Sequence, residues 1–368
     1  MSRRLPDFPW DTLAAAKATA QAYPGGFVDL SVGTPVDPTP QVVRDALAAA
    51  SDAHGYPQVW GTPDLREAIS AWFARRRNAH GVDPDGVLPV VGSKEFVAWL
   101  PTILGLGPDD AVGFPEAAYP TYDVGARIAG ARPVPAASTV QFGPSAPKLL
   151  WLNTPGNPTG QVLGVEHLAK VVRWARERGV IVASDECYAE LDWREGVDDL
   201  TTPSILDDRV CAGDHTGLLS VYSLSKQSNM AGYRAAFVAG DRDLVQQLLA
   251  FRKHAGMIVP WPVQRALLAA VQDDAHVAEQ KERYRRRRAM LKAALDESGW
   301  RTDYSDAGLY LWATKGQPCR ATVDELAAKG ILAAPGDFYG AAGAEHVRIA
   351  LTASDEQITS AAQRLTSG

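Results

Sequence analysis

Short apolar runs, each bounded by turn residues, recur along the chain and alternate with amphipathic helical patterns. The runs are rich in Val, Ile and Leu, and we expect them to form strands at residues 87–93, 111–114, 131–135, 148–153, 180–184, 218–223 and 235–239. Between such runs, residues 63–77 place Leu65, Ile69 and Trp72 at helical spacing, with arginines on the other positions. Buried strands that alternate with helices indicate an α/β sheet covered on both faces.

The pattern changes from about residue 241. Helical periodicity extends over residues 244–295, with a break near residues 257–262. Strands are then expected at residues 308–312 and 346–351, on either side of a helix around residues 322–329. This order predicts a second, smaller α+β domain.

Composition narrows the possible partners. The chain has 368 residues, of which 46% are hydrophobic, and a net charge of −6, so small metabolites are better candidates than nucleic acid or an anionic membrane. The run Arg285–Arg288 follows Glu279 and Glu282 and is interpreted as a solvated helix face.

The cysteines and the N-terminus bear on location. Cys187, Cys211 and Cys319 have neither metal-site nor disulfide spacing, which favours a reducing cytoplasm. Pro6 and Pro9 interrupt the N-terminus, so no signal peptide is expected, and no apolar run approaches the roughly 20 residues of a membrane span.

The segment with the most distinctive chemistry is Ser223-Leu224-Ser225-Lys226, followed by Gly232-Tyr233-Arg234. A lysine attacks a carbonyl only when it is deprotonated, and burial or a nearby cation lowers its pKa towards that state. Ser223, Ser225 and Arg234 are suitable donors to a phosphate. The segment is consistent with a phosphorylated aldehyde held by Lys226 as a Schiff base; a solvated surface loop is the alternative.

Two further motifs suit the ring of such a ligand. Asp185 follows the apolar run 180–183, where its carboxylate can keep a pyridine nitrogen protonated, and Tyr188 can reach a phenolic oxygen. Glu186 is expected to face the other way. Asn157 lies in the turn-rich segment 153–160 and can donate to the same ring oxygen. A helix cap or an ordinary turn explains each motif taken alone.

Three other positions complete the candidate site. The segment Gly92-Ser93-Lys94-Glu95 joins a strand to a helix, whose free backbone amides can bind phosphate. Tyr119 can stack on a planar ring or belong to the core. Arg348 stands in the apolar strand 346–351, where a carboxylate is expected to meet it unless it lies at a solvated edge.

In this order the motifs resemble the fold-type I, aspartate-aminotransferase-like enzymes of class I and II, which depend on pyridoxal 5'-phosphate (PLP). The similarity extends to Gly33 in Leu30–Pro35 and to Tyr56 with Gly61. It implies an α/β fold, with a three-layer αβα large domain around a mostly parallel seven-stranded sheet and a smaller α+β domain. The implied boundaries are 1–35 for an N-terminal arm and part of the small domain, 36–255 for the large PLP-binding domain and 256–368 for the C-terminal small domain.

The resemblance also implies roles. Lys226 would carry the Schiff base and transfer protons, Asp185 would pair with the pyridine nitrogen, Asn157 and Tyr188 would bind the ring oxygen and Tyr119 would stack on the ring. The implied phosphate ligands are the backbone of Ser93 and Lys94, the side chains of Ser223, Ser225 and Arg234, and Tyr56 from a second subunit. Arg348 would bind the substrate α-carboxylate, with Gly33 beside it. The implied protein is a homodimer with shared active sites and ping-pong kinetics, and no metal site is expected.

Among these enzymes the chain looks like the bacterial N-succinyldiaminopimelate aminotransferases of lysine biosynthesis. The similar segments are Phe8–Asp11, Asp29–Pro38, Gly92–Glu95 and Asp185–Tyr188. This implies glutamate as donor and a succinylated 2-amino-6-oxopimelate as acceptor. Lys94, Arg4 and Arg252 are unranked candidates for the distal carboxylate. Another aminotransferase, a PLP-dependent C–S lyase and a non-catalytic binding module remain alternatives.

Overall fold

The large part of the protein is built on a seven-stranded sheet. The structure is a computed structural model and describes residues 5–194, 196 and 202–367. The strand order is β2-β8-β7-β6-β5-β3-β4, and β8 runs antiparallel to the other six strands. The strands are β2 (Val87–Val91), β3 (Ala111–Phe114), β4 (Arg132–Pro135), β5 (Leu149–Asn153), β6 (Ile181–Asp185), β7 (Leu218–Ser223) and β8 (Ala235–Gly240). The predicted mostly parallel seven-stranded sheet is confirmed.

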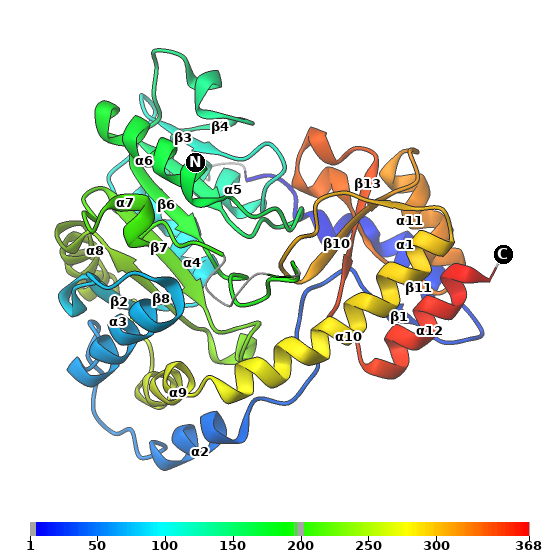
Figure 1. Cartoon of the computed structure of the whole chain (residues 1–368), viewed down its shortest axis with the longest axis horizontal. Coiled ribbons are helices and arrows are strands. Elements are labelled where there is room, and N and C mark those ends of the chain that lie inside the picture. Colours follow the sequence, from blue (N-terminus) through cyan, green and yellow to red (C-terminus); the bar gives the residue numbers. More distant parts are fainter. Residues whose placement is uncertain (1–4, 195, 197–201, 368) are drawn as a thin grey trace.

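Helices cover both faces of this sheet, because successive residues of a buried strand point to opposite sides (Figure 1). In β7, Leu219 and Val221 pack in the core shared with α4 (Ser93–Ile103), α5 (Thr121–Ala129) and α8 (Arg242–Ala255). Leu218 and Tyr222 belong to the core on the other face. The helices of that face are α3 (Pro63–Arg77), α6 (Val165–Arg178), α7 (Asp208–Cys211) and α9 (Trp261–Gln272). The result is the three-layer αβα arrangement.

The smaller part combines both ends of the chain. Its four-stranded antiparallel sheet has the order β12-β13-β10-β9, and a separate parallel pair joins β1 (Val28–Asp29) to β11 (Ile331–Leu332). The four strands are β9 (Arg301–Thr302), β10 (Tyr310–Thr314), β12 (Ala334–Pro335) and β13 (His346–Ala350). Its core includes residues of α1 (Ala14–Gln21), α10 (Ala275–Glu297), α11 (Cys319–Ala328) and α12 (Asp355–Thr366).

The helix α10 connects the two parts, as Figure 1 shows. The predicted break near residues 257–262 separates α8 from α9, but a second break at residues 273–274 was not predicted. Asp273 accepts a hydrogen bond from the amide of Ala275 at 3.0 Å, which favours a new helix start there. The domain boundary at residue 255 stays a prediction. Because α9 packs against α2 (Gln41–Ala49) and α3, we propose a boundary within α10 instead.

The interpretation of Arg285–Arg288 as a solvated face holds for only part of the run. Arg285 and Arg286 are exposed, whereas the Arg287 side chain is 4% exposed. Arg287 donates to both oxygens of Asp37, at 2.8 and 2.7 Å, and its Nε donates to Asp355 at 2.6 Å. Helical periodicity turns one residue of such a run towards the protein interior, where it forms an ion pair with a carboxylate distant in the sequence.

Cys187, Cys211 and Cys319 are buried and free. Within the described ranges, no helix combines the length and the apolarity needed to span a membrane.

The burial of Arg287 predicts that its loss lowers the free energy of unfolding more than the loss of the neighbouring Arg286. Arg287→Met leaves the carboxylate of Asp37, whose side chain is 13% exposed, without its cation. We expect the free energy of unfolding to fall by about 3 kcal/mol. The control Arg286→Met removes an exposed side chain 3.8 Å from Glu282 and should change this free energy by less than about 0.5 kcal/mol. Urea denaturation of the two variants measures the difference, and equal losses would contradict the buried ion pair.

Candidate active site

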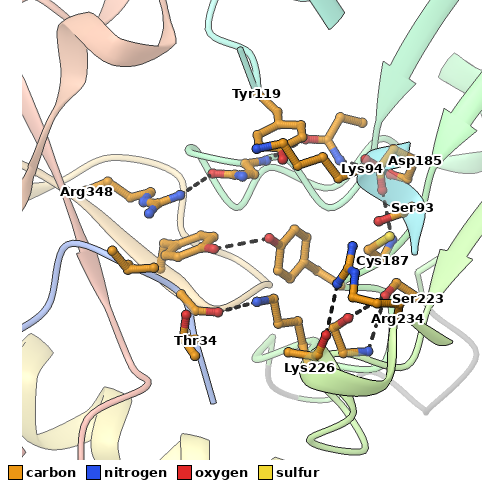
Figure 2. A pocket seen from close by; sticks show the side chains of 18 of the residues that line it. Thr34, Ser93, Lys94, Tyr119, Asp185, Cys187, Ser223, Lys226, Arg234 and Arg348 are labelled. Atoms are coloured by element: carbon orange, nitrogen blue, oxygen red, sulfur yellow. Dashed lines mark hydrogen bonds between the residues drawn. The ribbon is translucent and has the colours of Figure 1, made fainter. Parts of the chain in front are cut away.

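A cavity of about 540 Å³ opens where strands of the large sheet end (Figure 2). Asp185 and Ser223 are the last residues of β6 and β7, and Asn157 follows the end of β5. The carboxyl ends of parallel strands are the usual binding edge of an open α/β sheet. The small part closes the cavity from the opposite side with Tyr310 and Arg348.

The cavity brings together all but one of the residues assigned to the cofactor and to the substrate α-carboxylate. Its lining includes Gly33, Ser93, Lys94, Tyr119, Asn157, Asp185, Tyr188, Ser223, Ser225, Lys226, Arg234 and Arg348. Tyr56 is not among the lining residues, and its side chain is fully exposed. Its expected role involves a second subunit and stays a prediction.

Lys226 lies just beyond β7 and points into the cavity. Its Nζ donates a hydrogen bond to the carbonyl oxygen of Gly33. Burial lowers the pKa of Lys226 from its ordinary value, and the positive charges of Arg348 and Arg234 act in the same direction, against the opposing effect of Tyr310. A lysine in this environment is a better nucleophile and base near neutral pH than a solvated one.

One end of the cavity has donors suited to a phosphate. Ser223 Oγ and Ser225 Oγ are 2.9 Å apart, and α4 begins at Ser93 without a side-chain cap, which leaves first-turn amides available. The guanidinium of Arg234 packs on Gly92, where a Cβ would lie 2.2 Å from Arg234 Nη2. Glycine at position 92 therefore lets the arginine approach the start of the helix.

The opposite end has a buried carboxylate. Asp185 accepts hydrogen bonds from Tyr122 Oη at 2.9 Å and from the amide of Cys187 at 3.3 Å. Burial raises the pKa of Asp185, although both hydrogen bonds act in the opposite direction. Both donors are neutral, and among the described residues no cation pairs with Asp185. A protonated ring nitrogen would supply the missing charge.

Glu186 points away from this end, as predicted. Its carboxylate accepts from the amide of Ile205 at 2.7 Å and from Ser220 Oγ at 2.9 Å. The alternation of a strand thus separates the two adjacent acids.

Arg348 lies 3% exposed across the cavity from the sheet. It donates to Asn157 Oδ1 at 2.9 Å and to the carbonyl of Ser31 at 2.7 Å, and its guanidinium carbon lies 3.9 Å from the centre of the Tyr310 ring. Within the described part of the chain no carboxylate forms an ion pair with it. Because Oδ1 of Asn157 binds Arg348, the other end of this amide remains available as a donor.

Two tyrosines at the site were not predicted. Tyr122 holds Asp185 and stacks on Trp151, with ring centroids 5.1 Å apart. Its position three residues after Tyr119, at the start of a helix, was the available signal. Tyr310 Oη lies 3.2 Å from Tyr188 Oη, and a Cβ at Gly33 would lie 2.2 Å from Tyr310 Oη, so a glycine is needed there.

The electrostatics of Tyr310 depend on its neighbours. Burial acts to raise the pKa of Tyr310, but the charges of Arg348 and Lys226 outweigh it and place this pKa below its ordinary value. The two cations therefore stabilise the ionised form of the phenol.

The three candidates for a distal carboxylate differ in position. Arg252 is wrong for this role, because it is fully buried, does not line the cavity and donates to both oxygens of Glu95 at 3.0 and 3.2 Å. Arg4 lies outside the described residues. Lys94 lines the cavity, as does Tyr119 (Figure 2).

Comparisons with known proteins agree on one family. The model of the family "Aminotransferase class I and II" matches residues 26–365. A probable aminotransferase of Mycobacterium tuberculosis is 60% identical over all of this chain and 86% of its own length. The 4-dedimethylamino-4-oxo-anhydrotetracycline transaminase OxyQ of Streptomyces rimosus is 55% identical over 99% of this chain and 100% of its own length.

A solved structure is similar over the same extent. The probable N-succinyldiaminopimelate aminotransferase of Thermus thermophilus superposes with a TM-score of 0.86 at 28% identity, over 98% of this chain and 99% of its own.

The environment of Lys226 predicts a pH shift. Arg234→Gln removes one of the cations that lower the pKa of Lys226, so the amine should lose its proton at higher pH. We expect the pH profile of imine formation with pyridoxal, which lacks the phosphate, to move its midpoint to higher pH. Absorbance measures the reaction. Arg242→Gln, which replaces an exposed arginine paired with Asp83, is the control. An unchanged midpoint, or one moved to lower pH, in Arg234→Gln would contradict the electrostatic role.

Proposed function

Because the chain belongs to the class I and II aminotransferases, we propose that it transfers the amino group of glutamate to a succinylated 2-amino-6-oxopimelate in lysine biosynthesis. The chain is a PLP-dependent transaminase. The observation that carries the proposal is the cavity in which Lys226, Asp185 and Arg348 meet. The acceptor is favoured by the segments similar to N-succinyldiaminopimelate aminotransferases and by the fold shared with the Thermus thermophilus protein.

The cavity has hydrogen-bonding groups that suit both ends of PLP. The acidic end at Asp185 suits the pyridine nitrogen, and the end at Arg234 and α4 suits the phosphate. The residues proposed to hold the cofactor are Ser93, Lys94, Tyr119, Asn157, Asp185, Tyr188, Ser223, Ser225, Lys226 and Arg234. When bound, PLP supplies an electron sink for the charge left after a proton leaves the α-carbon.

Arg348 positions the substrate. It is buried, and its bonds to Asn157 and Ser31 fix the plane of its guanidinium. The α-carboxylate of an amino acid or a 2-oxo acid binds there through a charge-assisted pair of hydrogen bonds. Gly33 leaves room beside this position, because any side chain there would meet Tyr310.

Lys226 moves the proton. With its pKa lowered, Nζ accepts a proton from the α-carbon of the amino donor. In the second half-reaction the same nitrogen returns a proton to the α-carbon of the acceptor. The hydroxyls of Tyr310 and Tyr188 lie 3.2 Å apart, and both buried tyrosines line the same cavity as Lys226. The two half-reactions share one site, which gives ping-pong kinetics.

A second candidate function has its own support. The identity of 55% to OxyQ favours a transaminase with a large polycyclic acceptor. A C–S lyase would use the same cofactor ligands, because a shared fold does not fix the reaction. Product analysis separates these activities.

The choice of acceptor is tested with the purified holoenzyme. We expect that glutamate aminates the cofactor and that the succinylated oxopimelate restores it, with one 2-oxoglutarate formed for each acceptor consumed. Mass spectrometry of the products and the cofactor absorbance measure the two half-reactions. If the acceptor fails after amination by glutamate, the succinylated substrate is wrong while the transaminase remains. Pyruvate and ammonia from cystathionine would instead indicate a C–S lyase.

We also propose a homodimer in which Tyr56 binds the cofactor phosphate of the partner. The Tyr56 side chain is fully exposed and does not line the cavity of its own chain. An exposed aromatic side chain in a loop is suited to contact with another subunit.

Mixed dimers test this sharing. Tyr56→Phe alone should weaken PLP binding roughly tenfold, because a hydrogen bond to a charged group is lost. A mixed dimer pairs a Tyr56→Phe chain with a Lys226→Ala chain. The site that keeps Lys226 then receives the intact Tyr56 of the Lys226→Ala chain. Only that site gives the absorbance of lysine-bound cofactor, so we expect its affinity to return to the wild-type value. Failure to recover the affinity would contradict a shared site.

A further inference from the structure

We propose that a second cavity, next to the first, binds the part of the amino acceptor distal to the reacting carbon, and that Lys94 pairs there with an anionic group. This inference rests on the proposed transaminase function. It specifies the substrate as a 2-oxo acid whose chain exceeds that of glutamate and has a second anion.

The two cavities adjoin each other. The second has a volume of about 990 Å³ and shares Phe8, Trp10, Lys94 and Tyr119 with the first. The first cavity already has the size of an ordinary small-molecule pocket. A substrate no longer than glutamate would leave the second cavity to water.

The walls of the second cavity are mostly apolar and come from several segments of the chain. Its apolar lining residues include Leu5, Pro6, Phe8, Pro9, Trp10, Phe114, Pro120, Val124, Pro133, Pro135, Phe338, Ala341 and Ala342. The rings of Phe8 and Trp10 are 5.6 Å apart, and those of Trp10 and Phe338 are 5.2 Å apart. These contacts connect the N-terminal segment to the small part, so the wall is formed by both. Such a surface stabilises methylene groups and excludes water from them.

Lys94 is the cation suited to an anion in this cavity. Its ammonium lies 5.6 Å from the centre of the Phe8 ring, at the boundary that both cavities share. Among the described residues it has no carboxylate partner. The cavity's other described cation, Arg127, already donates to both oxygens of Asp123, at 2.7 and 3.0 Å.

The acidic residues restrict where an anion can bind. Asp7, Glu116 and Asp123 also line the second cavity. They disfavour an anion beside them, so the anion is placed at the boundary and the remaining apolar chain extends along the wall. A carboxylate at Arg348 and a second anion at Lys94 would hold the substrate at two points along its chain.

Binding of aliphatic acids to the holoenzyme tests this arrangement. Calorimetry compares glutarate, adipate, pimelate, suberate and azelate with the monocarboxylates of equal length. Each acid can occupy Arg348, but only a dicarboxylate of sufficient length also reaches Lys94. We expect one of the longer dicarboxylates to bind roughly tenfold tighter than its monocarboxylate, the scale of a hydrogen bond between charged groups.

The variant Lys94→Met keeps the backbone amide and the apolar stem. It should abolish the preference for the dicarboxylate while the affinity for the matched monocarboxylate changes less than about twofold. Lys170→Met, which replaces an exposed lysine of α6 away from both cavities, should keep the preference. A preference that persists in Lys94→Met, or one absent from the wild type at every length, would overturn the assignment. Amination of the cofactor by glutamate, recorded on the same sample, reports separately on the transaminase function.

Discussion

The confinement of two cations, Lys226 and Arg348, in one buried cavity is the constraint on which the site depends. Burial of charge is costly unless the charge is paired, and within the described chain neither cation has a carboxylate partner. Carbonyl oxygens of Gly33 and Ser31, the amide of Asn157 and the ring of Tyr310 provide partial compensation. Anionic ligands complete it. The same confinement lowers the pKa of Lys226, so the feature that attracts a carboxylate also prepares the base.

The fold maintains this arrangement by joining the two parts of the protein at several points. Lys226 lies just beyond β7 of the large sheet, whereas Arg348 belongs to β13 of the small part. The segment from Ser31 to Asp37 lies between them, because the carbonyls of Ser31 and Gly33 accept hydrogen bonds from Arg348 and Lys226. Arg287 of α10 anchors this segment through its ion pair with Asp37. Movement of one part relative to the other would therefore change the distance between the base and the carboxylate site. The apolar wall of Phe8 and Trp10 extends the same junction towards a longer substrate.

Much of the fold could be predicted from local pattern. Buried parallel strands such as β5 consist mainly of continuous apolar residues, and the Ser-x-Ser-Lys segment and the carboxylate at the end of β6 carry their chemistry in the sequence itself. Tyr122 and Tyr310 could not be found in this way, because their roles depend on neighbours distant in the chain. The same reason explains Arg287, which the sequence places in a charged run, and Arg252, whose partner Glu95 appears only in three dimensions. Tyr56 is exposed in a single chain, and the role proposed for it requires a second subunit.

The chemistry proposed for this cavity requires a covalent bond between Lys226 and the cofactor. Reduction of the holoenzyme with borohydride, followed by digestion and peptide mass mapping, detects this bond. We expect the mass of the reduced cofactor on the peptide that contains Lys226, together with a folded but inactive Lys226→Ala variant that gives no such peptide. Cofactor attached to a different lysine, or ordinary turnover by Lys226→Ala, would contradict it.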